Sequence, residues 1–268
     1  MAAAASAGPP AGKGPSHEVM QLALDAARRD DGPALKDLLA EHPSLANASD
    51  DAGTTLAKAA ASEGSLSCLR IALSAGADPN ANPLGSRTAL MAAAATAREP
   101  CVEALLHAGA NPNIVLPDTG TTALMMSARL GAALCLEHLL RAGARHSATD
   151  REGRSALRIA VDVGPKATAA VKVLLRHGAD PEQEAADGLS AMEAARVRGD
   201  AGLFTAMERA VAAAARLQAA GGATLKAAIR SAQLEADLEG TSIDEAGLRA
   251  RAADIMKEWE AARAGRKP

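Results

Sequence analysis

Aromatic side chains are almost missing from this sequence. Its 268 residues include one Phe, one Trp and no Tyr. Aromatic rings stack on the bases of single-stranded nucleic acids and fill compact cores, so their scarcity disfavours both arrangements. The core must instead be built from Leu, Ala, Ile, Val and Met. Such a core suits thin, closely packed helices.

A large excess of charge and a long apolar run are also lacking. The 29 Lys and Arg residues nearly balance 32 Asp and Glu residues, for a net charge of -3. This balance gives no global field that attracts DNA, RNA or anionic lipid, so we expect no nucleic-acid partner. No run of about 18 apolar residues is free of charges and helix breakers, and we expect no membrane span.

The residues that usually carry chemistry are few and scattered. Cys68, Cys101 and Cys135 are too few and too far apart for a disulfide framework or a paired zinc motif, which favours a reducing compartment. The sequence has no HExxH, GxSxG or Walker motif, and each of its six His residues is expected to be structural or solvated. We therefore expect no catalytic residue, no metal site and no cofactor. A cytoplasmic location is expected, with nuclear and organellar locations left open.

What the sequence does contain is a repeat. Gly-Ala recurs at intervals of 33, 34 and 35 residues. Leu or Val stands seven residues before each of these glycines, and Leu stands three residues before. Since these two positions are one helical turn apart, they predict the buried stripe of a second helix in each unit. The glycines are Gly76, Gly109, Gly143 and Gly178, and the two apolar registers are Leu69, Val102, Leu136 and Val171, then Leu73, Leu106, Leu140 and Leu175.

A second landmark lies in the first half of each unit, where Ser or Thr heads an Ala-rich apolar run. Its hydroxyl can accept a hydrogen bond from a free backbone N–H, as a helix N-terminus requires. The residues are Thr55, Thr88, Thr122, Ser155 and Ser190. Each unit is therefore predicted to be a turn, a helix, a tight link and a second helix. One unit cannot hide its apolar stripe alone, so stability must come from stacking of neighbouring units.

In this period and glycine register the sequence resembles the ankyrin-repeat family over roughly residues 20–210. It departs from the family's Thr-Pro-Leu-His motif, because Ala replaces the Pro and Met, Arg, Glu or Lys replaces the His. The resemblance implies an all-α fold, namely an ankyrin-repeat solenoid of about six helix-turn-helix units with short hairpin loops. The expected units are 17–49, 50–82, 83–116, 117–149, 150–184 and 185–210.

Two segments lie outside these units. Residues 1–16 are expected to be a disordered tail, with a targeting peptide left open. Residues 211–268 are expected to form a helical extension that either caps the solenoid or binds a second partner. Its last helix has an amphipathic stripe at helical spacing, made of Leu248, Ala252, Ile255 and Trp259.

The resemblance also implies where a partner protein binds, namely on a concave strip formed by the hairpin tips and the exposed face of the first helices. Interfaces are enriched in Arg and large apolar side chains. The excess of Arg over Asp in this strip favours a partner segment with acidic and aliphatic residues. The positions are Leu84, Arg87, Leu116, Thr121, Arg129, Leu130, Arg151, Arg154, Asp162, Val163, Val197 and Arg198, to which the last helix adds Trp259.

The alternative is that Leu116 packs within its own hairpin and that the arginines are merely solvated. As a surface residue, Arg154 is expected to contribute less than about 0.5 kcal/mol to folding. Leu140→Ala, on the predicted stripe, is expected to cost about 2 to 5 kcal/mol.

The sequence thus favours a protein that binds proteins and is not an enzyme. The first hypothesis is an adaptor or scaffold that is a monomer on its own. One alternative is a stoichiometric inhibitor or assembly chaperone whose C-terminal helix inserts into a client. Another is the regulatory subunit of an enzyme complex.

Overall fold

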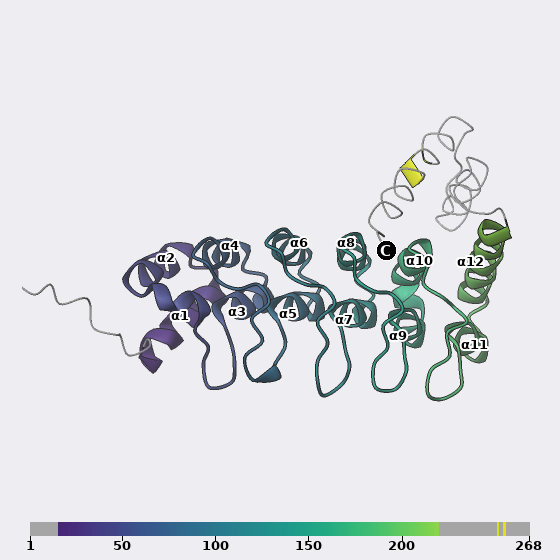
Figure 1. The fold of residues 1–268 in the computed structure, drawn as a ribbon, viewed down its shortest axis with the longest axis horizontal. Coiled ribbons are helices and arrows are strands. Elements are labelled where there is room, and N and C mark those ends of the chain that lie inside the picture. Colours follow the sequence, from purple (N-terminus) through teal and green to yellow (C-terminus); the bar gives the residue numbers. More distant parts are fainter. Residues whose placement is uncertain (1–15, 220–250, 252–253, 256–268) are drawn as a thin grey trace, which may run out of the picture. The chain divides into compact units, whose positions relative to one another are not determined.

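A computed structural model describes residues 16–219, 251, 254 and 255 (Figure 1). The regular elements among these residues are helices, with isolated antiparallel bridges at Ser49–Thr55, Thr149–Ser155 and Glu184–Ser190. This confirms the all-α prediction. The chain divides into two compact units, Met1–Pro117 and Asp118–Pro268, which are called unit 1 and unit 2 below.

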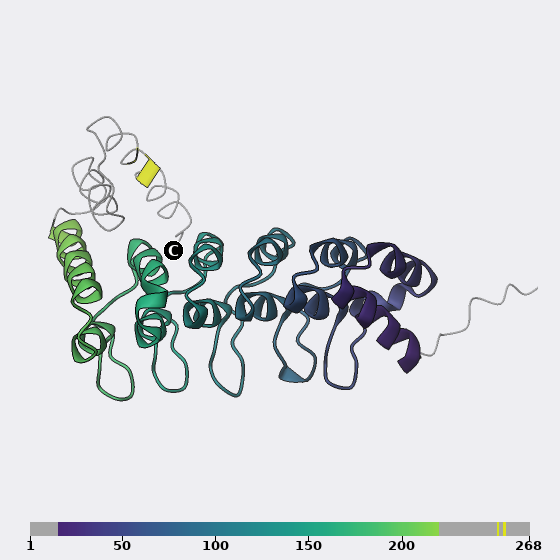
Figure 2. The same cartoon turned by 180° about the vertical axis from the view of Figure 1, so that it is seen from behind.

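Unit 1 consists of three helix pairs in two layers. The first helices of the pairs contact one another in order, and so do the second helices (Figures 1 and 2). Each pair joins the next through a hairpin on the side of the first helices. The elements are α1 His17–Arg29, α2 Gly32–Glu41, η1 Pro43–Asn47, α3 Leu56–Glu63, α4 Leu66–Ser74, η2 Pro83–Gly85, α5 Ala89–Ala95 and α6 Glu99–His107.

Unit 2 repeats this arrangement. Helix α9 contacts both α7 and α11 in the first-helix layer, and α10 contacts both α8 and α12 in the second. Helix α12 continues through residue 210, where the repeats were expected to end. The elements are α7 Ala123–Leu130, α8 Ala133–Arg141, α9 Ala156–Val163, η3 Pro165–Ala167, α10 Thr168–Arg176, α11 Ala191–Val197 and α12 Ala201–Ala219.

The first helices begin where the hydroxyl residues predict. Each of the five Ser or Thr hydroxyls accepts a hydrogen bond from the backbone N–H three residues later. At Ser190 the bond is reciprocal, because the Glu193 carboxylate accepts from the Ser190 N–H at 2.8 Å. These bonds satisfy N–H groups that the first turn of a helix leaves unpaired.

The buried stripe of the second helices differs in one detail from the prediction. Positions seven residues before the glycines are fully buried, as expected. Three residues before, Leu140 and Leu175 are buried, but Leu73 and Leu106 are only half-buried. In the last helical turn, the fully buried position is the one four residues before the glycine. Its residues are Ala72, Leu105, Leu139 and Leu174. At about 100° per residue, this position is central on the face toward the first helices, and the position three before is at its edge.

Hairpin glycines allow consecutive hairpins of unit 2 to stack on one another. Gly120 has φ +72°, and a Cβ added there would lie 3.0 Å from the Arg151 backbone nitrogen. Next to it, the Arg151 N–H donates to the Thr119 carbonyl at 3.0 Å. A side chain at Gly120 would push these two backbones apart.

Side chains that replace the motif's His bind across repeats. In unit 1, the Lys58 ammonium donates to the Gly53 carbonyl and to the Ser86 hydroxyl, each at 3.2 Å. In unit 2, Arg158 binds the hairpin of the following repeat. The inter-repeat connection therefore survives the change of residue type in these two repeats.

Two asparagines that follow the second helices, Asn47 at the end of η1 and Asn80 in the turn after α4, add a further connection in unit 1. The Asn47 amide donates to the Gly76 carbonyl at 2.8 Å and accepts from the Asp78 N–H at 2.7 Å. Asn80, 33 residues later, makes the same pair of bonds with Gly109 and Asn111. The period of this ladder equals that of the repeat, but its bonds join residues of different repeats and cannot be seen from spacing alone.

Other predicted features lie partly outside the described residues. The three cysteines are free and buried, as expected of small core residues. Of the predicted C-terminal stripe, Ile255 is helical and buried, whereas Leu248, Ala252 and Trp259 lie outside the described residues. The same holds for the N-terminal tail up to residue 15.

Candidate partner-binding surface

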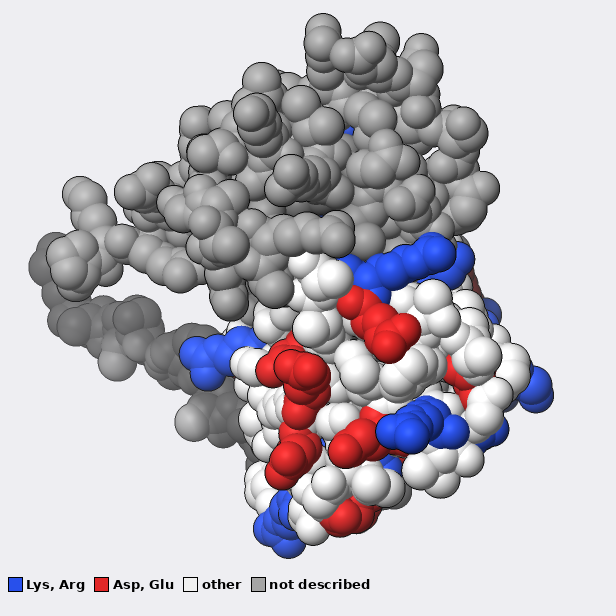
Figure 3. All heavy atoms as spheres, turned by 90° about the vertical axis from the view of Figure 1, so that its right-hand side faces the viewer, with Lys and Arg blue, Asp and Glu red and all other residues white. Residues whose placement is uncertain are grey.

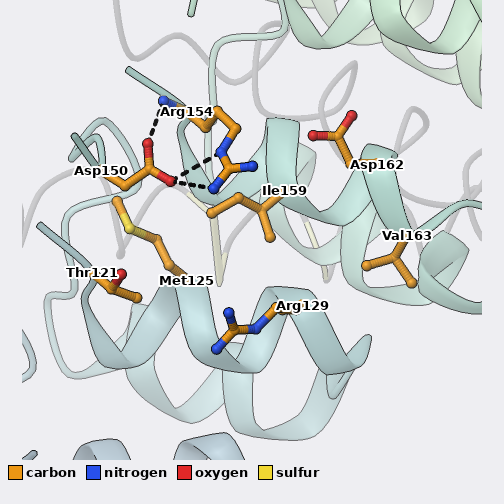
Figure 4. A pocket seen from close by; sticks show the side chains of 8 residues that line it. All are labelled: Thr121, Met125, Arg129, Asp150, Arg154, Ile159, Asp162 and Val163. Atoms are coloured by element: carbon orange, nitrogen blue, oxygen red, sulfur yellow. Dashed lines mark hydrogen bonds and ion pairs between the residues drawn. The ribbon is translucent and has the colours of Figure 1, made fainter. Parts of the chain in front are cut away.

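Five of the predicted contact residues meet in one pocket of unit 2. The pocket has a volume of about 260 Å³ and lies between α7, α9 and the hairpins that precede them (Figure 4). Three further residues line it that the sequence analysis did not single out: Met125, Asp150 and Ile159. The full lining is Thr121, Met125, Arg129, Asp150, Arg154, Ile159, Asp162 and Val163.

One wall of the pocket is an ion pair within a hairpin. The Asp150 carboxylate, whose side chain is 6% exposed, accepts from Nε and a terminal nitrogen of Arg154 at 3.0 and 2.9 Å. It also accepts from the backbone N–H groups of Arg154 and Glu152 at 2.8 and 3.0 Å. A second Arg154 nitrogen lies 2.9 Å from the Glu152 carboxylate. Arg154 is therefore held in place, and the view that it is merely a solvated surface side chain is wrong.

A second carboxylate in the lining, that of Asp162, forms an ion pair with Arg158, which does not itself line the pocket. Arg158 Nε donates to Asp162 at 3.2 Å, and the same guanidinium forms two bonds to Asp187 at 3.1 and 2.8 Å. A fourth bond reaches the Leu189 carbonyl at 2.7 Å. These acceptors raise the pKa of Arg158 further, with the hydrogen bond to Asp187 as the largest cause. Arg158 keeps its charge and neutralises the carboxylates around it.

Arg129 differs from both of these arginines. It projects from the last turn of α7 into the pocket (Figure 4), and its side chain is exposed. Among the described residues, nothing forms a hydrogen bond or ion pair with its guanidinium. Its five donors are therefore available to a group from outside this part of the chain.

The floor of the pocket is aliphatic. Met125 is buried in α7, and Ile159 and Val163 are half-buried along α9. Leu130, which is 49% exposed, follows Arg129 at the end of α7. An apolar floor beside a free cation can bind a side chain that has an aliphatic stem and a negative end.

Comparison with known proteins bears on the fold and on the kind of partner. The family described as "Ankyrin repeats (3 copies)" matches residues 23–115 and 111–185, which is more than half of the chain. The chain belongs to the ankyrin-repeat family. No curated protein matches it, whereas 479 chains of solved structures do, so the fold alone does not name the partner.

One similar solved structure is a complex between an enzyme and its immunity protein. Its title is "Bd0816 Predatory Endopeptidase from Bdellovibrio bacteriovorus in complex with immunity protein Bd3460". The sequence identity is 25% and the TM-score is 0.63. The match covers 74% of this chain and 99% of the matched chain. Ankyrin repeats are modules that bind proteins, and that general function applies to this chain.

The other predicted contact residues lie elsewhere on the ankyrin repeats. In unit 1, Leu84 is 80% exposed at a hairpin tip, Arg87 is exposed, and Leu116 is half-buried. In unit 2, four residues are exposed outside the pocket: Leu130, Arg151, Val197 and Arg198. Trp259 lies outside the described residues.

A different charged cluster occupies the second-helix layer of unit 2. Glu137 lies 2.9 Å from Arg141, 3.3 Å from His177 Nε2 and 3.6 Å from Arg176. Burial alone would raise the pKa of Glu137, but His177, Arg176 and Arg141 together lower it. Burial lowers the pKa of the nearby His146, and His177 lowers it further. These groups fasten α8 to the end of α10.

Two kinds of site are not found in the described part of the chain. Its His, Cys, Asp and Glu residues form no group of three or more that could hold a metal ion. None of its helices is long and apolar enough to cross a membrane. On the face of unit 2 near α11 and α12, acidic and basic side chains are interspersed with uncharged ones (Figure 3).

Proposed function

We propose that this ankyrin-repeat protein is a stoichiometric inhibitor that binds one enzyme and blocks it, in the manner of an immunity protein. The supporting observation is the likeness to the endopeptidase–immunity protein complex. The match covers 99% of the matched chain, so this chain contains a counterpart of nearly the whole of it. We assign the likeness to the immunity protein because the shared fold is a stack of ankyrin repeats.

The pocket of unit 2 supports a binding role over a catalytic one. Its two carboxylates are each paired with an arginine, and neither Cys nor His lines it. A nucleophile needs an adjacent base, and this lining offers none. The free cation and aliphatic floor instead resemble a contact for a partner side chain.

The inhibitor hypothesis is preferred to the adaptor hypothesis. The similar solved structure pairs an immunity protein with a single enzyme, which supports an inhibitor of one partner over a scaffold that links two. The predicted residues that the structure brings together form one surface in unit 2.

The test is capture of the partner followed by an activity titration. Immobilised full-length protein is used to recover its partner from the native cell, and the purified partner is then assayed with increasing amounts of the chain. We expect a recovered enzyme, a hydrolase in the first instance, to lose activity with an end point at one chain per enzyme. A captured partner with undiminished activity, or a chain that links two partners at once, would contradict the proposal.

A further inference from the structure

The pocket of unit 2 has one unneutralised charge, and that charge is positive. Arg154 forms ion pairs with Asp150 and Glu152, and Asp162 forms an ion pair with Arg158. Arg129 alone among the charged lining residues has no partner in the described part of the chain. Its guanidinium can form two parallel hydrogen bonds with a carboxylate, which is the strongest arrangement open to it.

We propose that this pocket is a recognition subsite for a glutamate side chain of the partner protein, with Arg129 binding the carboxylate and the aliphatic floor holding the side-chain stem. This inference rests on the proposed function and adds the chemistry of the partner residue. Complementary charge between an exposed arginine and the incoming residue provides specificity and register. Arginine is also among the residues that dominate binding energy at interfaces.

The lining favours a side-chain carboxylate over a C-terminal one. Chain termini are usually captured by a nest of free backbone N–H groups. Here the backbone N–H groups are already used: that of Thr121 donates to Thr119, that of Met125 to Thr122, and that of Arg154 to Asp150. One side-chain cation above an apolar floor fits a glutamate, whose two methylenes can contact Met125, Ile159 and Val163.

The neighbouring surface shows what should flank that glutamate. Leu130 and Val163 occupy the same position in successive repeats, directly before the link glycines Gly131 and Gly164. Val197, which is 76% exposed, ends the first helix of the following repeat. Leu130 and Val197 thus add exposed aliphatic side chains to the first-helix layer of unit 2, and Val163 lines the pocket itself. The partner segment is therefore expected to carry aliphatic residues on one or both sides of the glutamate.

The experiment uses the full-length chain with 13C-labelled Met methyl groups and three short peptides. The probe is Ac-Leu-Glu-Leu-NH2, and the controls are Ac-Leu-Gln-Leu-NH2, which is neutral, and Ac-Leu-Gln-Leu-OH, which has only a terminal carboxylate. The signal followed is the Met125 methyl group in the pocket. Met126, which is buried but does not line the pocket, is the internal control.

We expect the glutamate peptide to shift the Met125 signal saturably and to leave Met126 unchanged. Arg129→Gln should weaken this peptide by about tenfold or more, because a charge-assisted hydrogen bond is lost. Arg129→Lys should retain part of the affinity. Arg196→Gln, at an exposed arginine of α11 outside the pocket, should bind as the unaltered chain does. Both glutamine peptides should bind at least about tenfold more weakly than the probe.

Three results would overturn the inference: equal binding of all three peptides, an undiminished shift in Arg129→Gln, or no saturable shift up to about 10 mM peptide. The proposed function is judged separately. If Arg129→Gln inhibits the captured enzyme as well as the unaltered chain does, the subsite fails and the inhibitor function stands. If the chain does not inhibit its partner but the peptide results hold, the function fails and the subsite stands.

Discussion

Arg158 connects two successive repeats, and its replacement provides a sharp test of the packing argument. The Arg158 side chain is 8% exposed. Its guanidinium donates hydrogen bonds to Asp162, Asp187 and the Leu189 carbonyl. A hydrogen bond to a charged group contributes about 1.5 to 3 kcal/mol when it is protected from water. The side chains of Asp162 and Asp187 are 36% and 49% exposed, so solvent screening weakens both pairs. The hydrogen bond from Arg158 to the carbonyl of the half-buried Leu189 contributes about 1 kcal/mol more to the free energy of unfolding.

Arg158→Met keeps the aliphatic stem and removes these bonds, so we expect a loss of about 2 to 3 kcal/mol in the free energy of unfolding. Urea titration followed by circular dichroism measures it, and Arg196→Met, at an exposed arginine, is the matched control with a change within about 0.5 kcal/mol. Because repeats are held by their neighbours, hydrogen exchange should accelerate first in residues 184–197, beyond the broken connection.

The free energy of unfolding at acid pH provides a second test of the Arg158 connection. The hydrogen bond from Arg158 holds the pKa of Asp187 below its usual value. The stability that this pair provides is therefore complete above about pH 4 and is lost as the pH falls through the lowered pKa. Arg158→Met should show a smaller loss of stability on acidification than the unaltered chain. A penalty below about 1 kcal/mol, or an unchanged acid limb, would refute the account of Arg158 as an inter-repeat connection.

Three further predictions concern unit 2. Leu139→Ala, at a fully buried position, should cost about 2 to 5 kcal/mol in urea unfolding, whereas Leu134→Ala, at a residue 62% exposed, should stay within about 0.5 kcal/mol. Gly120→Ala should lower the melting temperature more than Gly143→Ala, since both have positive φ but a Cβ meets backbone only at Gly120; equal losses would contradict hairpin stacking. Glu137→Gln should cost about 1 to 3 kcal/mol at pH 7. Because the Glu137 pKa is lowered, that difference should be lost as the pH falls through the lowered pKa, and a difference that persists at strongly acid pH would exclude the ion cluster as its cause.

The fold was predictable because its determinants are local and periodic. A hydroxyl residue at Thr122 or Ser155 sets a helix start through a bond that spans three residues. The stripe at Leu136 follows from helical spacing alone. The finer ranking, in which Leu139 is more deeply buried than Leu106, depends on how each second helix is rotated against the first-helix layer. A single sequence does not contain that rotation.

The candidate site was predictable only in part. Position within the repeat identified Arg129 and Val163 as outward-facing, and the structure brings them together. Position in the repeat also marks Arg154 as a surface arginine, but Asp150, four residues earlier, lies under the hairpin and pairs with it. Met125 was missed because it occupies the motif's His position, which is usually assigned to packing. Contacts across repeats depend on the offset between units, which spacing along the chain does not give.

The side chains just before the link between helices decide which part of the chain is suited to bind a partner. At the ends of α3 and α5 in unit 1 these are Glu63 and Thr96, both exposed and polar. At the ends of α7 and α9 in unit 2 they are Leu130 and Val163, and at the end of α11 the residue is Arg198. All five positions lie at the same point of the repeat, so stacking does not demand the difference. Leu130 is 49% exposed at this point, and a partner that covered it would remove this apolar surface from water. The change from polar to aliphatic residues therefore favours unit 2, around Arg129, as the part of the repeat array that is specialised for recognition.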